Sequence, residues 1–434
     1  MNILALSHMD PFRGGGGLRA FKALKAYVER GVRVKIFWAY EKPIDENPES
    51  NFTRISKSLA MLVSSGAIYC GALQVKTFSY ALPLLKRSLI HAESLAFSRF
   101  EISQRCQLSV KEREKMDTCV VAMYEDPLLL SAARRISGYE GLKSVAFLLL
   151  PPFYGDKARM RNIELSHILY LREIHRRKTS FRAYEILARK FRNLWRPHLE
   201  KLLKNFDLLV AVSRSIPLEM GVEWGNIKIL DPSLNLDKED LELIERVLRE
   251  YGSKYPKHRD NLVLFSTRPD AEKGIIEALY AFSFMSKKRP ELRLAITGKM
   301  SKSAREGILK LAKKLGILDK VILTGYISRE ELFKIRARSR LLLYPSHVDS
   351  FSFTILEALY LGLPIIGYDI PGNRYSFLEK GAKGISLVKE FDVVSMAEEG
   401  LRMIDDNVEV SPPNLPSWDE IVSKEIELLR RVVG

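Results

Sequence analysis

The stretch LLLYPSHVDSFSFTILEALYLGLPIIGY, residues 341–368, contains one complete unit of strand, loop, helix and strand. Apolar runs at residues 341–344 and 364–368 predict two buried strands, and the segment between them predicts a helix that follows a polar loop. Two strands joined by a crossover helix are typical of a parallel sheet. This stretch therefore indicates an α/β domain.

The same alternation continues on both sides of this stretch. Further apolar strands are predicted at residues 3–7, 32–40, 119–123, 144–150, 208–212, 262–267, 292–297, 320–324 and 384–388. We predict two doubly wound, Rossmann-like domains at residues 1–235 and 261–410, joined by a charge-dense linker at 236–260. Residues 411–434 are predicted to end in a helix that Ser417 caps and that packs back toward the first domain.

The composition is that of a globular protein with a strong positive charge. Hydrophobic residues make up 46% of the 434 residues, and the net charge is +16 at pH 7. Such a charge favours anionic partners, which include nucleic acids, acidic lipid headgroups and phosphorylated small molecules. Cys70, Cys106 and Cys119 show no metal-binding spacing, and the N-terminus lacks a basic, apolar leader. We therefore expect reduced thiols and a cytoplasmic location.

Two cations follow the predicted strand at 262–267. Arg268 and Lys273 lie just beyond the carboxyl end of this strand, where open α/β sheets bind their ligands. There they could clamp a diphosphate and stabilise it as a leaving group. In the alternative interpretation, both are surface charges that pair with Asp270 and Glu272.

The loop and helix after residue 344 carry two acids and three hydroxyls. Asp349 falls in the loop, and Glu357 falls about one turn inside the predicted helix. A carboxylate accepts two hydroxyls well, so either acid could hold a ribose or a hexose. Ser350, Ser352 and Thr354 lie between the acids, where the first N–H groups of the helix would face an anion. For Asp349, a capping network is the alternative interpretation.

A run of four glycines, Gly14, Gly15, Gly16 and Gly17, separates the first predicted strand from the first predicted helix. A loop without side chains lets a phosphate or a sugar approach the backbone and the helix N-terminus. The spacing differs from the dinucleotide fingerprint, which disfavours NAD, and a loop without any ligand is the alternative. His8 lies beside the glycines and could contact a ligand, although lone histidines are often structural.

With these motifs in this order, the sequence resembles the retaining glycosyltransferases of family 4, which have the GT-B fold. The resemblance covers nearly the whole chain. Its motifs are the pair Arg268 and Lys273, the acids Asp349 and Glu357 with seven residues between them, the glycine run and the final helix after Ser417. It implies two Rossmann-like domains that face each other across a cleft, the first binding the acceptor and the second the nucleotide sugar.

The resemblance also implies a role for each matched position. Arg268 and Lys273 would hold the donor diphosphate, Glu357 the nucleotide ribose and Asp349 the donor sugar. The facing wall of the cleft would be lined by the glycine run at 14–17. Backbone amides around Phe351, Ser352, Phe353 and Thr354 would complete the phosphate cradle, and Ser350 would be a further substrate-binding residue.

The sequence departs from the family pattern in two places. The family usually has Glu where this chain has Asp349, a shorter acid, which weakens the donor-sugar assignment. Many relatives also carry a histidine in the loop after a strand in the middle of the first domain. The corresponding stretch here, residues 148–154, contains none. This second departure leaves open a catalytically silent relative that binds a nucleotide sugar without turning it over.

The implied activity is transfer of a sugar from a nucleoside-diphosphate sugar to an acceptor hydroxyl with retention of configuration, in glycan, glycolipid or cell-surface polysaccharide synthesis. We expect no metal and no other cofactor, because an Asp-x-Asp signature is absent and Arg268 and Lys273 supply positive charge. The alternatives are the silent relative, a nucleotide-sugar epimerase of the same fold, and a basic nucleic-acid-binding protein. A nucleic-acid partner is not expected, because the sequence contains no recognisable nucleic-acid module.

A basic segment at residues 171–204 carries about half of the excess charge, with 11 Lys and Arg residues against 3 Glu. Apolar residues recur along one face of it at helical spacing. This face either packs into the core below a solvated basic face, or lies on an anionic membrane. The expected partners are thus a nucleotide-sugar donor, a glycan, lipid-linked or small-molecule acceptor, and, in the second interpretation, the cytoplasmic face of a membrane.

Overall fold

The computed structural model describes residues 1–7, 15–41, 59–75, 99–102, 116–176, 180–251 and 259–434. The chain divides into two compact units. The first contains Met1–Gly155, Ile186–Leu234 and Trp418–Gly434, and the second contains Asp156–Glu185 and Asn235–Ser417. The segment at 156–185, which the sequence pattern places in a continuous first domain, is thus grouped with the second unit.

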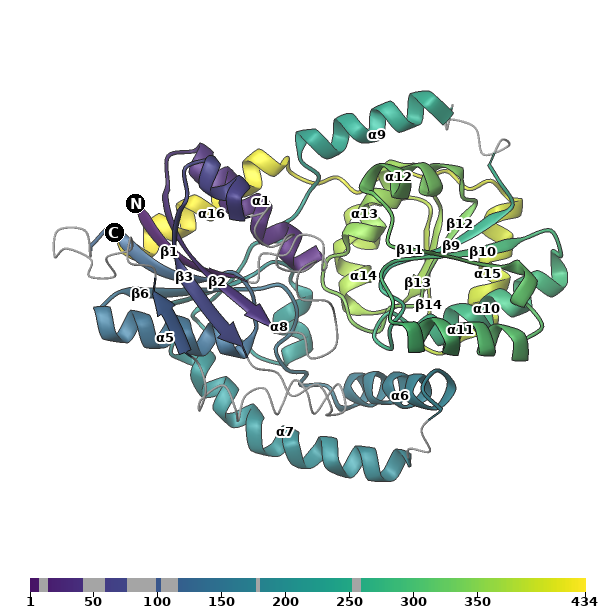
Figure 1. The fold of residues 1–434 in the computed structure, drawn as a ribbon, viewed down its shortest axis with the longest axis horizontal. Coiled ribbons are helices and arrows are strands. Elements are labelled where there is room, and N and C mark those ends of the chain that lie inside the picture. Colours follow the sequence, from purple (N-terminus) through teal and green to yellow (C-terminus); the bar gives the residue numbers. More distant parts are fainter. Residues whose placement is uncertain (8–14, 42–58, 76–98, 103–115, 177–179, 252–258) are drawn as a thin grey trace. The chain divides into compact units, whose positions relative to one another are not determined.

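The first unit is built on an eight-stranded sheet in the order β4-β3-β2-β1-β5-β6-β7-β8 (Figure 1). All neighbouring strands are parallel except β3 and β4. The inner strands β1 and β5 are buried on both faces, which explains their unbroken apolar sequences. The strands are β1 (Asn2–Ser7), β2 (Arg33–Glu41), β3 (Ile68–Val75), β4 (Arg99–Ile102), β5 (Thr118–Ala122), β6 (Lys143–Leu148), β7 (Leu208–Ala211) and β8 (Ile227–Ile229).

The helices of the first unit include the C-terminal helix of the chain. Helix α16 carries Glu425, whose carboxylate accepts hydrogen bonds from Arg19 and Tyr27 of α1 and from Ser233 at 2.7 Å. Glu425 and Tyr27 are fully buried, so these bonds fix α16 against α1. The helices are α1 (Gly15–Glu29), α5 (Pro127–Glu140), α8 (Ser215–Met220), α16 (Trp418–Val433) and most of α7 (Phe181–Lys204), within which the two units divide.

The second unit contains a six-stranded parallel sheet in the order β11-β10-β9-β12-β13-β14. Because β9 comes first in sequence and is flanked by β10 and β12, the strand order reverses between β9 and β12, and this is a topological switch point. The strands are β9 (Leu262–Ser266), β10 (Arg293–Thr297), β11 (Val321–Gly325), β12 (Leu341–Tyr344), β13 (Ile365–Tyr368) and β14 (Ile385–Val388). The predicted doubly wound fold class is confirmed in both units.

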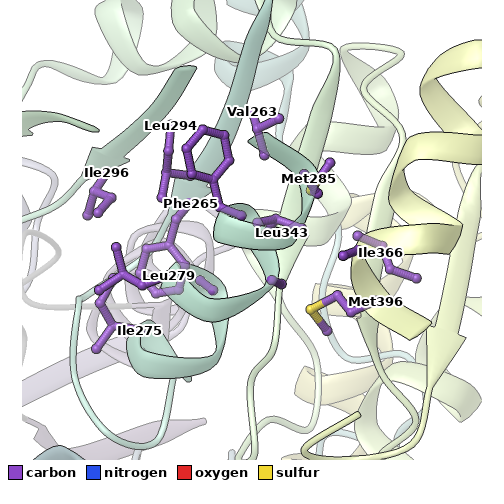
Figure 2. Close-up of a cluster of buried hydrophobic side chains, with 14 of the residues drawn as sticks. Val263, Phe265, Ile275, Leu279, Met285, Leu294, Ile296, Leu343, Ile366 and Met396 are labelled. Carbon is purple, nitrogen blue, oxygen red and sulfur yellow. The ribbon is translucent and has the colours of Figure 1, made fainter. Parts of the chain in front are cut away.

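The helices of the second unit bury their apolar faces on this sheet. Figure 2 shows side chains of β9, β10, β12 and β13 packed against those of α10 and α15, including Phe265, Leu279 and Met396. These three side chains are fully buried. The longer helices are α6 (Lys157–Glu173), α9 (Lys238–Tyr251), α10 (Ile275–Lys288), α11 (Lys302–Lys314), α12 (Arg329–Arg338), α13 (Phe353–Tyr360) and α15 (Val393–Asp405). Three short turns complete the unit, α14 (Pro371–Ser376), η2 (Leu318–Lys320) and η3 (Leu378–Lys380).

Two helices of the second unit lie outside the strand and helix alternation. Helix α9 forms most of the predicted linker and packs on α12, where Asp240 accepts a 2.8 Å hydrogen bond from Arg329. Helix α6 packs near α10, and the Tyr170 hydroxyl donates to the carbonyl of Pro269 at 3.3 Å. In the described part of the chain, no helix combines the length and the hydropathy needed to cross a membrane.

Candidate active site

The candidate site lies at the switch point of the second sheet. Strands β9 and β12 are parallel neighbours, so their carboxyl ends lie side by side. The loop after β9 leads to α10 and carries Arg268 and Lys273, and the loop after β12 leads to α13 and carries Asp349. The topology therefore brings the predicted cations and the first predicted acid to one edge of the sheet, where open α/β sheets bind ligands.

Lys273 connects the two loops. Its Nζ lies 2.7 Å from Oδ2 of Asp349 and 2.9 Å from the carbonyl oxygen of Val348, and only 15% of the side chain is exposed. Burial alone would lower the pKa of Lys273, but the carboxylate of Asp349 outweighs burial and raises this pKa above its ordinary value. Lys273 is therefore a fixed positive charge at the switch point, and not a surface charge paired with Glu272.

Glycines allow the loops to pack this closely. Gly274 has a φ of +71°, and a Cβ on it would lie 2.0 Å from the carbonyl oxygen of Pro345. A Cβ on Gly372 would lie 2.1 Å from the carbonyl oxygen of Asp349. Side chains at these two positions would push apart the backbone segments that carry Lys273 and Asp349. Neither glycine is marked by its local sequence, because the need for glycine depends on contacts with a distant loop.

Arg268 differs from Lys273 in its surroundings. Its side chain is 57% exposed, and its Nε lies 3.7 Å from Oδ2 of Asp270. This agrees with the surface ion pair that the alternative interpretation describes. An exposed guanidinium held by a long ion pair can turn toward an anion at low cost. Arg268 therefore remains suited to bind a phosphate group that reaches the end of β9.

Glu357 lies on α13 with its carboxylate between two arginines of α12. Arg329 donates from Nη2 to Oε1 at 2.6 Å, and Arg336 donates to Oε2. Arg336 is fully buried and also donates to the Ser266 hydroxyl, at 3.0 Å from Nη2. Burial would raise the pKa of Glu357, but the two guanidinium groups lower it below its usual value. A ligand hydroxyl at Glu357 would therefore join an existing buried ion-pair network.

The hydroxyl and aromatic residues predicted to bind substrate, at positions 350–354, differ in their contacts. Ser352 is the N-cap of α13 and accepts a 3.3 Å hydrogen bond from the backbone of Ile355. Thr354 donates to the carbonyl of Ser266 at 3.2 Å. Ser350 is fully buried, and its hydroxyl has no hydrogen-bond partner among the described residues. Phe351 packs on Phe377 with ring centroids 5.0 Å apart, and Phe353 begins α13.

The glycine run belongs to the first unit. Gly15, Gly16 and Gly17 form the first turn of α1, and not an open loop as expected, while His8 and Gly14 lie outside the described residues. A Cβ on Gly16 would lie 2.4 Å from the ring of Tyr124. The close packing of α1 on Tyr124 therefore explains Gly16 without a ligand.

His347 is a buried residue of the site region to which the sequence analysis gave no role. Its ring lies between two carboxylates, with Nδ1 2.8 Å from Glu390 and Nε2 3.1 Å from Glu277. Its carbonyl accepts a 2.6 Å hydrogen bond from Arg159 of α6, which also pairs with Glu390. These contacts fix the loop that precedes Asp349. The partners come from three distant segments, so local sequence carries no signal of them.

The His347 cluster predicts a specific pH dependence of stability. Burial would lower the pKa of His347, but Glu277 and Glu390 raise it above its ordinary value. A raised folded-state pKa gives stability that is complete below about pH 6.5, the unfolded value, and is lost as pH rises through the folded value. We expect the urea midpoint of the wild type to decrease as the pH is raised from about 6 to about 9. The free energy of unfolding should decrease by about 1.4 kcal/mol for each unit by which the folded-state pKa is raised.

Two variants test this pH dependence. His347→Gln should flatten the curve above about pH 6.5, because it removes the titrating ring. His198→Gln, which changes an exposed histidine of α7, should leave the wild-type slope unchanged. A wild-type slope that persists in His347→Gln would contradict this origin of the pH dependence.

Comparison with known proteins agrees with this geometry. Residues 250–412, which contain all the site residues of the second unit named above except those of α6, match the family described as glycosyl transferases group 1. An alpha-D-kanosaminyltransferase of Streptomyces kanamyceticus is 28% identical over 167 residues, which is 38% of this chain and 42% of that protein. The match therefore spans less than half the length of this curated relative.

Solved structures match over the whole chain. A sucrose-phosphate synthase from Thermosynechococcus elongatus has a TM-score of 0.61 at 15% identity, over 100% of this chain and 99% of that one. The Anabaena protein HepE, in complex with UDP and glucose, has a TM-score of 0.55 at 14% identity over 99% and 95%. Both show the fold of this chain and not its substrate. Residues 250–412 are thus similar to the glycosyl transferases group 1 family, in a chain whose two doubly wound units are those of the GT-B fold.

Proposed function

We propose that this protein is a glycosyltransferase that transfers a sugar from a nucleoside-diphosphate sugar to an acceptor hydroxyl, with retention of configuration. The observation that carries the proposal is the placement of Lys273, fixed by Asp349 at the switch point, beside the exposed cation Arg268. Two positive charges at the carboxyl end of β9 suit a diphosphate, whose negative charge grows as it leaves the sugar. The group 1 family match over this unit supports the same ligand class.

The carboxylates of the site support retention without an enzymatic nucleophile. Asp349 is bound by Lys273, and Glu357 is bound by Arg329 and Arg336. A carboxylate held in such ion pairs is a weak nucleophile, because its negative charge is already compensated. The departing diphosphate can instead accept the proton of the incoming hydroxyl on the same face. The contribution of the protein is then positioning and charge stabilisation.

We also propose that the reaction needs no metal ion and no other cofactor. Lys273 and Arg268 would supply the positive charge that a divalent cation supplies to a diphosphate in other enzymes. The first unit would bind the acceptor, in glycan, glycolipid or cell-surface polysaccharide synthesis. Incubation with UDP-, GDP- and ADP-sugars and an acceptor extract, with EDTA present, tests the proposal. It predicts release of one nucleotide and a product of unchanged anomeric configuration. Inversion, a requirement for added metal, or a freed rearranged monosaccharide would contradict it.

A finer proposal concerns where the protein acts. Within the first unit, α7 exposes Ile186, Leu187 and Leu194, by 57%, 42% and 63%. Exposed cations lie along the same helix, including Arg189 and Lys190. Ala188 and Leu199 of the same helix are buried, so the core takes one stripe of α7 and leaves this mixed surface outside. Cations with exposed apolar side chains complement an anionic bilayer, where each Lys or Arg contributes about 1 kcal/mol. We propose that this face binds the cytoplasmic surface of an anionic membrane.

Vesicle flotation tests the membrane proposal. We expect the protein to float with phosphatidylglycerol vesicles and not with phosphatidylcholine vesicles, and to be released by salt. The double variant Arg189→Glu, Lys190→Glu should lose flotation, because it reverses two charges at the surface. Lys238→Glu, an exposed change on α9 in the second unit, is the matched control and should float like the wild type. Equal flotation of the double variant, or equal binding to neutral vesicles, would contradict the proposal.

A further inference from the structure

A chain of hydrogen bonds runs from the start of α13 to Asp349. The backbone N–H of Ile355 donates to the Ser352 hydroxyl at 3.3 Å, and the Ser352 hydroxyl donates to the Tyr344 oxygen at 2.7 Å. The Tyr344 hydroxyl in turn donates to Oδ2 of Asp349. The direction is fixed, because a backbone N–H can only donate and an ionised carboxylate can only accept.

Both protein donors converge on the same oxygen of Asp349. Lys273 binds Oδ2 at 2.7 Å, and Tyr344 binds Oδ2 as well. Among the described residues, no group donates to Oδ1, and about a tenth of the Asp349 side chain remains exposed. A carboxylate has about four acceptor sites on two oxygens, so Oδ1 keeps its full capacity. Two donors on Oδ2 fix the carboxylate so that Oδ1 is left to accept a hydrogen bond from a ligand.

We infer that Tyr344 is a positioning residue that sets the rotation of the Asp349 carboxylate, so that Oδ1 accepts a hydroxyl of the donor sugar. This inference rests on the proposed function, because it gives Asp349 a sugar to bind. The terminal torsion of an aspartate is broad, and Lys273 alone would leave the carboxylate free to turn about its contact. A second donor from another direction removes that freedom.

The surroundings of Tyr344 suit this role. It ends β12, which pairs with β9 on one side and β13 on the other, and its side chain is buried. A hydroxyl on a buried strand residue is held more firmly than one on a loop. Burial and the nearby Asp349 carboxylate raise the pKa of Tyr344, so the phenol keeps the proton that it donates. The chain carries the shorter Asp at this position, and the Tyr344 hydroxyl reaches it there.

The variant Tyr344→Phe removes one oxygen and keeps the ring. We expect kcat with the nucleotide sugar to fall about 10-fold to 100-fold. This is the size of the effect when a residue that orients a metal ligand by a hydrogen bond is lost in metalloenzymes. Affinity for the free nucleotide should stay within about twofold, because Tyr344→Phe keeps the ring that lies 6.0 Å from the Nζ of Lys273 and removes only the hydroxyl, which contacts Asp349 and Ser352. Tyr360→Phe is the matched control, since it removes a tyrosine hydroxyl that bonds Asn235 at 3.4 Å, and should keep the wild-type kcat.

A double-mutant cycle with Asp349→Ala decides between positioning and a merely structural role. Once the carboxylate is absent, Tyr344→Phe should cause no further loss of kcat. The inference is overturned if Tyr344→Phe lowers kcat equally in both backgrounds, lowers nucleotide affinity in parallel with kcat, or leaves kcat unchanged. A wild type that turns over no nucleotide sugar would instead overturn the proposed function. The Tm values of the same variants then test the contact between Tyr344 and Asp349. We expect the Tm shifts of the two single variants not to add up in the double variant, and additive shifts would overturn the contact.

Discussion

Replacing Glu357 with alanine should lower the free energy of unfolding by about 3–5 kcal/mol, the cost of breaking a buried ion pair by removing one partner. The loss follows from Arg336, which is fully buried and, among the described residues, would keep only the Ser266 hydroxyl as a hydrogen-bond partner. Arg329 would lose the same partner but keep Asp240. Urea unfolding of the purified variant measures the change.

Two controls separate the Glu357 effect from the loss of any acid. Glu398→Ala breaks an exposed ion pair with Lys288 and should change stability by at most about 1 kcal/mol. Glu357→Gln keeps the shape of the side chain and one hydrogen-bond acceptor, so it should lower the free energy of unfolding by less than Glu357→Ala does. A Glu357→Ala variant as stable as Glu398→Ala would contradict the buried network. Because alanine weakens the fold itself, Glu357→Gln is the better variant for testing ribose binding.

Replacing Lys273 with methionine should weaken nucleoside-diphosphate binding at least about 30-fold, the effect of losing about 2 kcal/mol from a buried charge contact. Its Nζ is held between Asp349 and the carbonyl of Val348, which fixes its positive charge at the switch point. A ligand that binds only the folded state raises Tm by mass action. The wild type should gain Tm with one of UDP, GDP or ADP at millimolar concentration, and Lys273→Met should not.

The Lys273→Met experiment needs a control in which a lysine outside the site is removed. Lys288→Ala removes an exposed lysine of α10, a helix that follows the same loop, and should keep the full nucleotide response. Lys273→Arg keeps the positive charge and should recover part of the response. If Lys273→Met shows the wild-type Tm gain, Lys273 does not bind the diphosphate.

The strands of the second sheet could be predicted from sequence because each is a short apolar run between polar loops. The same reasoning placed Arg268, Lys273 and Asp349 at strand ends, and the parallel topology then brought them together. Strand β8 was missed because it has only three residues, which are too few to show the period of a strand.

The remaining features depend on contacts between residues far apart in sequence. Arg336 lies 21 residues before Glu357, and nothing in its local sequence marks it as buried. Helix α6 joins the second unit through contacts such as Asn162 with Glu390, at 2.6 Å and across 228 residues. A single sequence carries no record of such pairs. For the same reason the cluster around His347 and the hydroxyl chain of Tyr344 became visible only in three dimensions.

The most direct test of the account is hydrogen exchange of the backbone amides with and without UDP, GDP and ADP. A nucleoside diphosphate should bind at the switch point between β9 and β12. The account predicts that one nucleotide slows exchange in peptides that cover residues 266–274 and 344–357, and that the peptides of α15 are unchanged. Protection elsewhere in the chain, or no protection by any of the three nucleotides at millimolar concentration, would contradict it.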